Sequence, residues 1–265
     1  MHRTRLAVSL LPGLILTASL SAQDTREIRR DLPLAADGRV VIETYKGSVT
    51  VTAWDQPRVD VVASIEPDGS DDPSQPEKVR LTEVRIESSG NEVRIKSDYD
   101  AIKEKQRWWK FEDGDHGTLP LVRYTVRMPR RAALQLKDHK SRIDVRGLQG
   151  EIDLDSYKGI VELADVPGVR LKTYKGEVTA RFDRFERHSS FETYKGEILV
   201  ELPARAGFDL DADTGKKGNL DTDFEIAMRA SGRDDDERSY HGAVNGGGPE
   251  LRLETYKGSF RIRQR

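Results

Sequence analysis

The pentapeptide ETYKG occupies Glu43–Gly47 and returns unchanged at Glu192–Gly196 and Glu254–Gly258. Two close variants, DSYKG and KTYKG, lie at Asp155–Gly159 and Lys172–Gly176. A short sequence that recurs at a nearly fixed spacing within one chain indicates a structural unit that recurs as well. The spacing and the residues around each copy therefore predict the fold.

The copies lie about 20 residues apart, as in coiled repeat proteins. When the copies are aligned on their Lys-Gly pair, Lys158, Lys175 and Lys195 are 17 and 20 residues apart. Two degenerate copies, LQLKDHKSRIDV and LDADTGKKGNLD, extend the series through Lys140 and Lys217, and the last copy follows 40 residues later. This spacing predicts a β-solenoid, in which each repeat forms one coil.

Apolar and polar residues alternate on both sides of each Lys-Gly pair. In the last copy, Leu251 and Leu253 precede the pair, and Phe260 and Ile262 follow it. Such alternation is typical of strands with one buried face. Thr255 and Phe260 are five residues apart, an odd step that cannot keep both on one face of a straight strand. The chain must therefore turn at Tyr-Lys-Gly.

We expect the glycine of each copy to form this corner with a positive φ angle or an equivalent tight-corner conformation, because glycine adopts a positive φ without steric penalty. The expected corner glycines are Gly47, Gly159, Gly176, Gly196, Gly218 and Gly258. The Thr or Ser before each tyrosine should point inward and bond to the corner backbone. Coils stack about 4.8 Å apart, so the tyrosines should form one outward column and the lysines another.

The predicted fold is all-β, with a single-stacked β-solenoid (β-helix) over residues 131–265. Longer alternating segments over 37–130 predict an antiparallel β cap that continues into the solenoid, because solenoid ends expose strand edges that need a cover. Residues 23–36 are expected to be an N-terminal linker. The charged, glycine-rich segment 229–248 is expected to be a mobile loop.

Residues 1–22 are typical of a signal peptide. Arg3 and Arg5 precede the apolar run Leu6–Leu20, and small residues follow at Ser21 and Ala22. This order predicts export to the periplasm, the extracellular space or the cell surface, with an uncleaved anchor as the alternative. No second apolar run would span a membrane after cleavage. The chain contains no cysteine, so disulfides and cysteine-bound metals are excluded.

The sequence offers no strong catalytic, cofactor or metal motif. It lacks a P-loop and a G-x-S-x-G elbow, and its histidines are isolated, so we expect no enzyme, cofactor or metal. Asp209, Asp211 and Asp213 share a strand face that would suit calcium, although a solvated face is the simpler interpretation. The formal net charge of −2 gives no indication of nucleic-acid binding.

The Tyr-Lys pairs are the candidate ligand site. They are Tyr45, Lys46, Tyr157, Lys158, Tyr174, Lys175, Tyr194, Lys195, Tyr256 and Lys257. Tyrosine faces would bind sugar rings and ammonium groups would bind carboxylates or phosphates, which suits an anionic glycan, a cell-wall polymer or an envelope protein. Alternatively, the columns only stabilise the fold. In that case the neighbouring acids should neutralise the lysines; these are Glu43, Asp155, Glu177, Glu192, Glu197 and Glu254.

A second aromatic cluster lies in QRWWKF, residues 106–111. Trp108, Trp109 and Phe111 are expected in a loop rich in Lys and Arg. Exposed aromatics beside cations would suit a glycan or a membrane surface. The alternative is that these side chains hold the loop against the strands.

Four motifs in order resemble the bacterial adhesin domain family, which is similar to the head domains of auto-transporter adhesins. They are GSVTV (47–51), YTVRMPRRAALQL (124–136), ILVELPARAGFDLDADT (198–214) and LRLETYKGSFRI (251–262). The resemblance covers residues 35–263 and implies an exported or surface-associated protein without established biochemical activity. A small polar pair usually precedes the corner glycine in that family, whereas Tyr-Lys precedes it here.

Together these observations predict an exported, non-enzymatic interaction module of the cell surface or envelope. Two alternatives remain open. One is a β-helical enzyme that acts on polysaccharides, and the other is an envelope-stress accessory protein that binds another protein.

Overall fold

The computed structural model describes residues 25–109, 118–228 and 239–265. The expected signal peptide and Phe111 lie outside these residues. The described chain is all-β, with one large mixed sheet and short helices. No helix among the described residues is long and apolar enough to cross a membrane.

The elements of the first half are β1 (Arg26–Pro33), β2 (Arg39–Glu43), β3 (Lys46–Trp54), β4 (Arg58–Glu66), α1 (Gln75–Leu81), β5 (Glu83–Ser89), β6 (Glu92–Asp98), α2 (Asp100–Trp109) and β7 (Leu121–Pro129). The elements of the second half are β8 (Ala133–Arg146), β9 (Ile152–Ala164), β10 (Arg170–Arg181), β11 (Ser189–Thr193), β12 (Glu197–Leu202), β13 (Phe208–Asp213), β14 (Asn219–Thr222), β15 (Ala227–Met228), β16 (Ser239–Val244), β17 (Glu250–Thr255) and β18 (Ser259–Gln264).

Successive repeats pair in parallel and in register through the corner. Lys158 of β9 lies opposite Lys140 of β8 on one side and Lys175 of β10 on the other. The first half of β10 then pairs with β11 and its second half with β12, and these strands pair in turn with β17 and β18. Equivalent residues of the repeats therefore lie beside one another along the whole stack.

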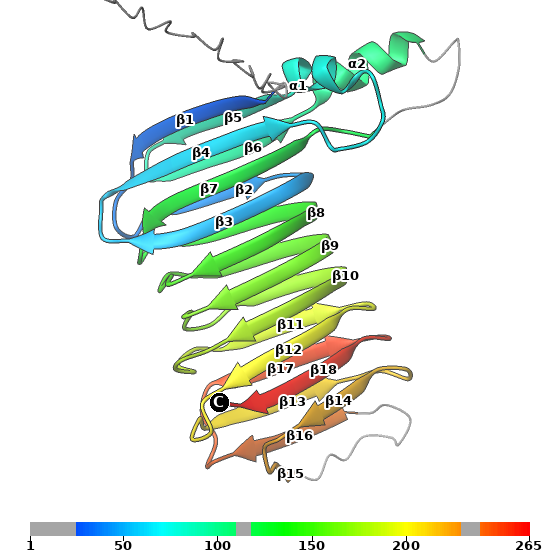
Figure 1. Cartoon of the computed structure of the whole chain (residues 1–265). Coiled ribbons are helices and arrows are strands. Elements are labelled where there is room, and N and C mark those ends of the chain that lie inside the picture. Colours follow the sequence, from blue (N-terminus) through cyan, green and yellow to red (C-terminus); the bar gives the residue numbers. More distant parts are fainter. Residues whose placement is uncertain (1–24, 110–117, 229–238) are drawn as a thin grey trace, which may run out of the picture.

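The halves of the repeats before and after the corner form two layers of an elongated stack, seen from the side in Figure 1. The alternating apolar residues face inward. Leu154 and Leu171 before the corner, and Val161 and Val178 after it, are at most 2% exposed. The core is narrow, as expected for a chain in which hydrophobic residues make up only 36%.

The order of the coils in space differs from their order in the chain. The coil of β17 and β18 lies between the coil of β11 and β12 and the coil of β13 and β14. The series through Lys195, Lys217 and Lys257 is therefore not sequential in the stack, and Lys257 follows Lys195 directly. Strand β16 pairs antiparallel with β13, and the chain then returns through β17 on the other side of β13.

The first half is mixed rather than purely antiparallel. Strands β2 and β3 pair in parallel with β6 and β7 on one side and with β8 on the other. Antiparallel pairing is confined there to β1–β4, β4–β7 and β5–β6. These pairs end the stack at the edge beyond β7 and β6.

Three segments differ from the expectations. The expected linker 23–36 contains β1, which pairs along its whole length with β4. The expected mobile loop 229–248 contains β16, while residues 229–238 lie outside the described chain. Trp108 and Trp109 end helix α2 rather than lying in a loop, since Asp100 and the charged residues after it continue as a helix.

Positive φ angles occur at only two of the expected corner glycines, Gly47 and Gly159. Gly176, Gly196, Gly218 and Gly258 have no positive φ angle, so that part of the expectation is wrong for them. Glycine is needed there because neighbouring atoms lie too close to admit a Cβ atom. A Cβ atom on Gly196 would lie 2.6 Å from Thr193 Oγ1, and one on Gly258 would lie 2.7 Å from Thr255 Oγ1. Each would also collide with the carbonyl oxygen of the glycine in the neighbouring coil.

The inward threonines bond to the corner backbone, as predicted, in two copies. The backbone N–H of Gly196 donates to Thr193 Oγ1 at 2.7 Å, and that of Gly258 donates to Thr255 Oγ1 at 2.7 Å. Thr173 occupies the equivalent position in β10, but its buried Oγ1 has no hydrogen-bond partner among the described residues. Threonine at this position therefore accepts a corner hydrogen bond in two coils but not in the coil of Thr173.

Gly196→Ala should lower the free energy of unfolding by about 3 kcal/mol or more, because the coils must separate to admit a Cβ atom. Gly69→Ala is the control, since its Cβ would meet nothing within 4 Å and only its φ of +78° is unfavourable, a cost of about 1–2 kcal/mol. Urea unfolding of both variants measures the difference. Equal losses would show that close approach does not select glycine at the corner.

Thr193→Val should cost about 1–3 kcal/mol, because it leaves the buried N–H of Gly196 without an acceptor. Thr173→Val removes a hydroxyl that has no partner, so it should be neutral or stabilising. Thermal unfolding followed by circular dichroism compares the two variants. A similar loss for both would contradict the assignment of the corner hydrogen bond.

The tyrosine and lysine columns as a candidate binding face

Six aromatic rings form one continuous column on the outside of the corners. In order along the stack they are Tyr45, His139, Tyr157, Tyr174, Tyr194 and Tyr256. Neighbouring ring centroids are 4.5–5.2 Å apart and the rings are nearly parallel. Backbone bonds fix this spacing, since the N–H of Lys195 donates to Tyr174 O and the N–H of Lys257 donates to Tyr194 O, each at 3.0 Å. The predicted tyrosine column is confirmed.

His139 is a member of the column that the sequence interpretation missed. Its ring lies 4.5 Å from Tyr45 and 4.8 Å from Tyr157. The signal was present in the sequence, because KDHKS (137–141) aligns with DSYKG, with Asp138 at the Thr position and Ser141 at the Gly position. An aromatic residue thus occupies the tyrosine position of this degenerate copy as well.

Asp138 lies inward of His139 and is 8% exposed. Its Oδ2 accepts hydrogen bonds from Ser141 N–H at 2.9 Å and from Ser156 Oγ at 3.1 Å, whereas Oδ1 has no hydrogen-bond partner among the described residues. Burial raises the pKa of Asp138 despite the bonds from Ser141 and Ser156. This carboxyl group faces the interior, so it belongs to the corner and not to the exposed face.

Stacking covers the faces of the inner rings. Each ring from His139 to Tyr194 has a neighbour on both sides. Tyr45 is also covered at the start of the column, where Tyr99 packs edge-on against it at 6.2 Å. Four of the tyrosines remain 40–48% exposed, and Tyr194 is half-buried. The expectation that these rings offer faces to sugars along the column is therefore wrong.

The lysine column lies beside the tyrosines. Lys158, Lys195 and Lys257 place Nζ within 5.1–5.6 Å of the centroid of the tyrosine in the same copy. Within the described residues, none of these three lysines forms an ion pair, nor do Lys140 and Lys175. Five exposed ammonium groups therefore follow one another, one per coil, without a counterion from the described chain.

Lys46 is different from the other lysines of the column. Its Nζ donates to Asp68 Oδ2 at 3.0 Å, and its side chain is only 20% exposed. Burial of Asp68 disfavours its charge, but hydrogen bonds from Ser70, Thr118 and Lys46 outweigh burial and hold the Asp68 pKa well below its usual range. The free part of the column thus begins at Lys140.

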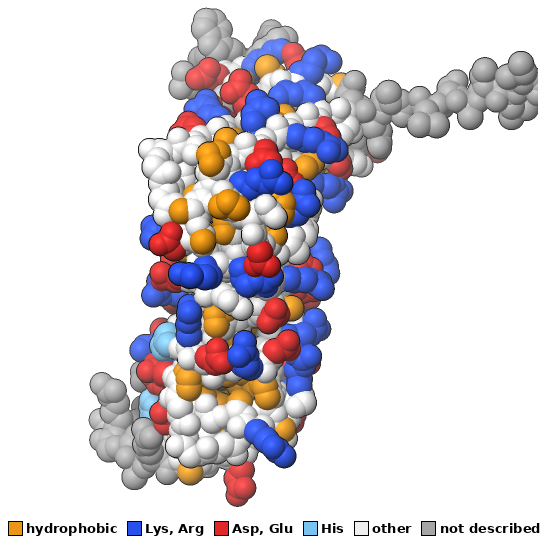
Figure 2. All heavy atoms as spheres, turned by 90° about the vertical axis from the view of Figure 1, so that its left-hand side faces the viewer, with side chains coloured by type: hydrophobic (Ala, Val, Ile, Leu, Met, Phe, Trp, Pro, Cys, Tyr) orange, Lys and Arg blue, Asp and Glu red, His pale blue; other side chains and the backbone are white. Residues whose placement is uncertain are grey.

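Three of the acids expected to neutralise the lysine column pair with other cations. Glu192 pairs with Lys172 at 2.6 Å. Glu43 pairs with Arg94 at 3.3 Å, and Glu254 approaches Arg252 at 3.7 Å. These three acids therefore meet cations other than the corner lysines, on a neighbouring strand for Glu192 and Glu43 and on the same strand for Glu254. Figure 2 shows the side of the stack at the arrowheads of β8, β9 and β10. Acidic and basic side chains are interspersed on that side as well.

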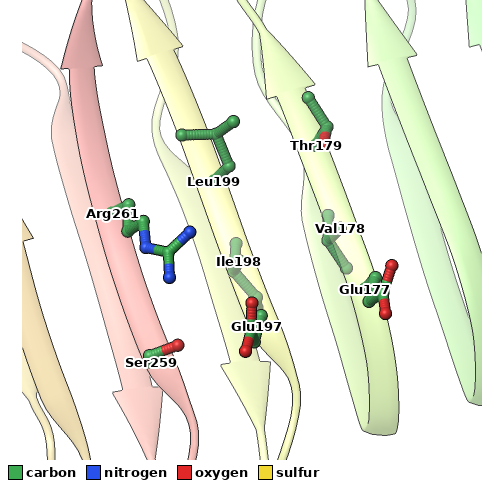
Figure 3. A pocket seen from close by; sticks show the side chains of 8 residues that line it. All are labelled: Glu177, Val178, Thr179, Glu197, Ile198, Leu199, Ser259 and Arg261. Atoms are coloured by element: carbon green, nitrogen blue, oxygen red, sulfur yellow. The ribbon is translucent and has the colours of Figure 1, made fainter.

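The acidic pair Glu177 and Glu197 lies on the outside of β10 and β12, just after the corner glycine in each repeat (Figure 3). The hollow beside it also contains Arg261 of β18 and holds about 170 Å³. Ligand sites usually hold about 300–1,000 Å³. This hollow is too small to enclose a sugar chain, so it gives no support to a polysaccharide-cleaving site.

Asp209, Asp211 and Asp213 share one strand face, and the carboxylates of Asp211 and Asp213 each contact a nearby residue. Asp211 approaches His241 Nδ1 at 3.0 Å, and Asp213 Oδ1 accepts the N–H of Gly215 at 2.8 Å. No group of three or more His, Cys, Asp or Glu suited to a metal occurs in the described parts of the chain. These contacts favour a solvated, locally bonded strand face.

No family model matches the chain, and no curated protein matches it. Among solved structures, it is similar to a candidate cell adhesion protein from Clostridium sporogenes, at 12% identity over 91% of this chain and 100% of that chain, with a TM-score of 0.48. It is also similar to a candidate adhesin from Bacteroides fragilis, at 10% identity over 89% and 97%, with a TM-score of 0.33. A candidate lipid-binding protein from Parabacteroides distasonis matches at 11% identity over 89% and 96%, with a TM-score of 0.32.

Tyr174→Leu should lower the free energy of unfolding by about 1–3 kcal/mol, because the ring stacks on two neighbours at about 0.5–1.5 kcal/mol per pair. Tyr256→Leu makes the same substitution at the end of the column, where the ring stacks only on Tyr194, so it should cost about half as much. Urea unfolding of both variants provides the comparison. Equal losses would mean that ring stacking contributes little to stability.

Proposed function

We propose that the chain is an exported β-solenoid protein with a capped end that binds an anionic polymer of the cell envelope along its lysine column. The polymer class is an acidic glycan or a cell-wall polymer. The observation that carries this proposal is the run of exposed lysines without ion pairs, one per coil from Lys140 to Lys257, among the described residues.

The lysine column differs electrostatically from many cations of the strand faces. Arg142 pairs with Glu162 at 2.5 Å and Arg181 pairs with Glu201 at 2.6 Å, so these two strand cations have counterions. Two unit charges about 4 Å apart repel by about 1 kcal/mol even in water. Adjacent corner lysines carry a cost of this kind, which a bound polyanion relieves.

The spacing of the column suits a polymer rather than a small ion. Coils follow one another about 4.8 Å apart, so a chain with repeating carboxylates or phosphates meets several ammonium groups at once. Linked contacts bind far more tightly than single ones, because each contact after the first is intramolecular. The stacked tyrosines hold the corners in line and thereby keep the lysines in register.

Export and a surface role rest on the sequence. Residues 1–22 carry the features of a signal peptide, and the ordered motifs resemble adhesin domains. A protein in the periplasm or at the cell surface meets anionic envelope polymers directly. The proposal therefore unites the chemistry of the lysine column with the compartment indicated by the sequence.

Replacement of Lys158, Lys175 and Lys195 by Gln should weaken binding to polygalacturonate by at least tenfold, and wild-type binding should fall as salt is added. The control replaces Lys96, Lys103 and Lys105 by Gln. It removes the same charge from β6 and α2 and should leave binding nearly unchanged. Calorimetry measures both variants.

A change in melting temperature without a change in polygalacturonate binding would contradict the proposal and leave the columns with a structural role only. An equal loss in both triple variants would mean that net charge, rather than the column, controls binding.

A further inference from the structure

The aromatic column stops one coil before the coil of β13 and β14. The pairing of Asp213 with Glu254 and of Asn219 with Ser259 brackets this corner. Counting from the first pair places Gly215 opposite Tyr256, and the corner of β13 and β14 has one residue more. Gly215 has a φ of +54° and donates its N–H to Asp213 Oδ1 at 2.8 Å.

No aromatic ring of the described chain stacks on the second face of Tyr256. One face packs on Tyr194 at 5.2 Å, while Gly215, whose Cβ position would lie 3.5 Å from Tyr256 Cα, brings no ring to the other side. Tyr256 is accordingly the most exposed tyrosine of the column, at 48%. It is the one ring of the column whose face, and not only its edge, is open to a ligand.

A cavity of about 510 Å³ lies at this position. Its walls include Tyr194, Tyr256, Gly215, Asp213, Glu254 and Lys216. This volume falls within the range of small-ligand sites, about 300–1,000 Å³. The cavity is three times the volume of the hollow beside Glu177, which holds about 170 Å³.

The polar groups of the cavity define the chemistry of the ligand. Ionised carboxylates only accept hydrogen bonds, so Asp213 and Glu254 require donors on the ligand. Glu254 approaches Arg252 only at 3.7 Å and keeps acceptor capacity. An uncovered aromatic face binds a flat, weakly polar surface. A pyranose ring combines such a C–H face with hydroxyl donors around its rim.

We propose that this cavity is a subsite for one pyranose ring, which stacks on Tyr256 and donates hydroxyl hydrogen bonds to Asp213 and Glu254. This inference rests on the proposed function, because it assigns the end of the lysine column to a saccharide unit of the same polymer. Lys216, which also lines the cavity, supplies the cation for an acidic substituent. The polymer would then be an acidic glycan.

The test uses hexagalacturonate, with chitohexaose and cellohexaose as neutral probes. Tyr256→Leu should weaken the binding of hexagalacturonate and of at least one neutral probe by about tenfold, whereas Tyr256→Phe should retain binding because it keeps the ring face. Saturation-transfer NMR measures the contacts, and melting temperatures show that each variant is folded.

Gly215→Asn separates ligand binding from stacking. Asn tolerates a positive φ better than other residues with side chains, and it adds a side chain beside Tyr256 without altering the aromatic column. This variant should lose saccharide binding and melt somewhat below the wild type, because its φ stays positive and its Cβ would lie 3.0 Å from Thr255 O; circular dichroism at the assay temperature shows that it is folded. Binding that is undiminished in both Tyr256→Leu and Gly215→Asn would overturn the subsite, as would the failure of every probe to bind.

The lysine variants distinguish the two proposals. If the lysine column fails, Gln at Lys158, Lys175 and Lys195 leaves hexagalacturonate binding unchanged while Tyr256→Leu still weakens the neutral probe. If the subsite fails, the lysine variant weakens hexagalacturonate binding and Tyr256→Leu has no effect on any probe.

Discussion

Parallel backbone hydrogen bonding in register is the constraint on which the rest of this structure depends. It places each residue of a repeat beside its counterpart in the next repeat, so a single choice of side chain becomes a column. The glycine column allows the coils to approach, the threonine column satisfies corner N–H groups, and the tyrosine column stacks. The lysine column is a consequence of the same register, and its repulsion is a cost that the other columns offset.

The strands, the corner and the tyrosine column were predictable because they depend on local spacing. The odd step from Thr255 to Phe260 indicates a turn without any knowledge of neighbours. The reason for glycine at Gly196 was not predictable, because the atom that excludes a Cβ belongs to a coil 20 residues earlier. The pairing of β17 with β11 was not predictable either, because neither segment's sequence specifies which distant strand it pairs with.

In the candidate site, too, local features were predictable from the sequence and contacts between distant segments were not. The sequence located every tyrosine and lysine of the columns but assigned the wrong ion pairs. Glu192 precedes Lys195 in the chain, yet it meets Lys172, because strand neighbours in space differ from neighbours in sequence. The column also removed the ring faces that single tyrosines would expose. Only the alignment of Gly215 against Tyr256 reveals where a face remains, and that alignment depends on the coil order.

The insertion of β17 and β18 into the stack has a consequence for assembly. During synthesis, β13 and β14 emerge before the coil that must separate them from β11 and β12. Until then, β11 and β12 present an open parallel edge, and β13 and β14 are the nearest strands able to occupy it. In the correct fold, the edge of β11 and β12 is therefore occupied by β17 and β18, which are synthesised later than β13 and β14. The tyrosine in that late segment matches the open ring of Tyr194, whereas Gly215 in the earlier coil does not. Ring stacking on Tyr194 therefore favours the coil of β17 and β18 over the coil of β13 and β14 at this edge of the stack.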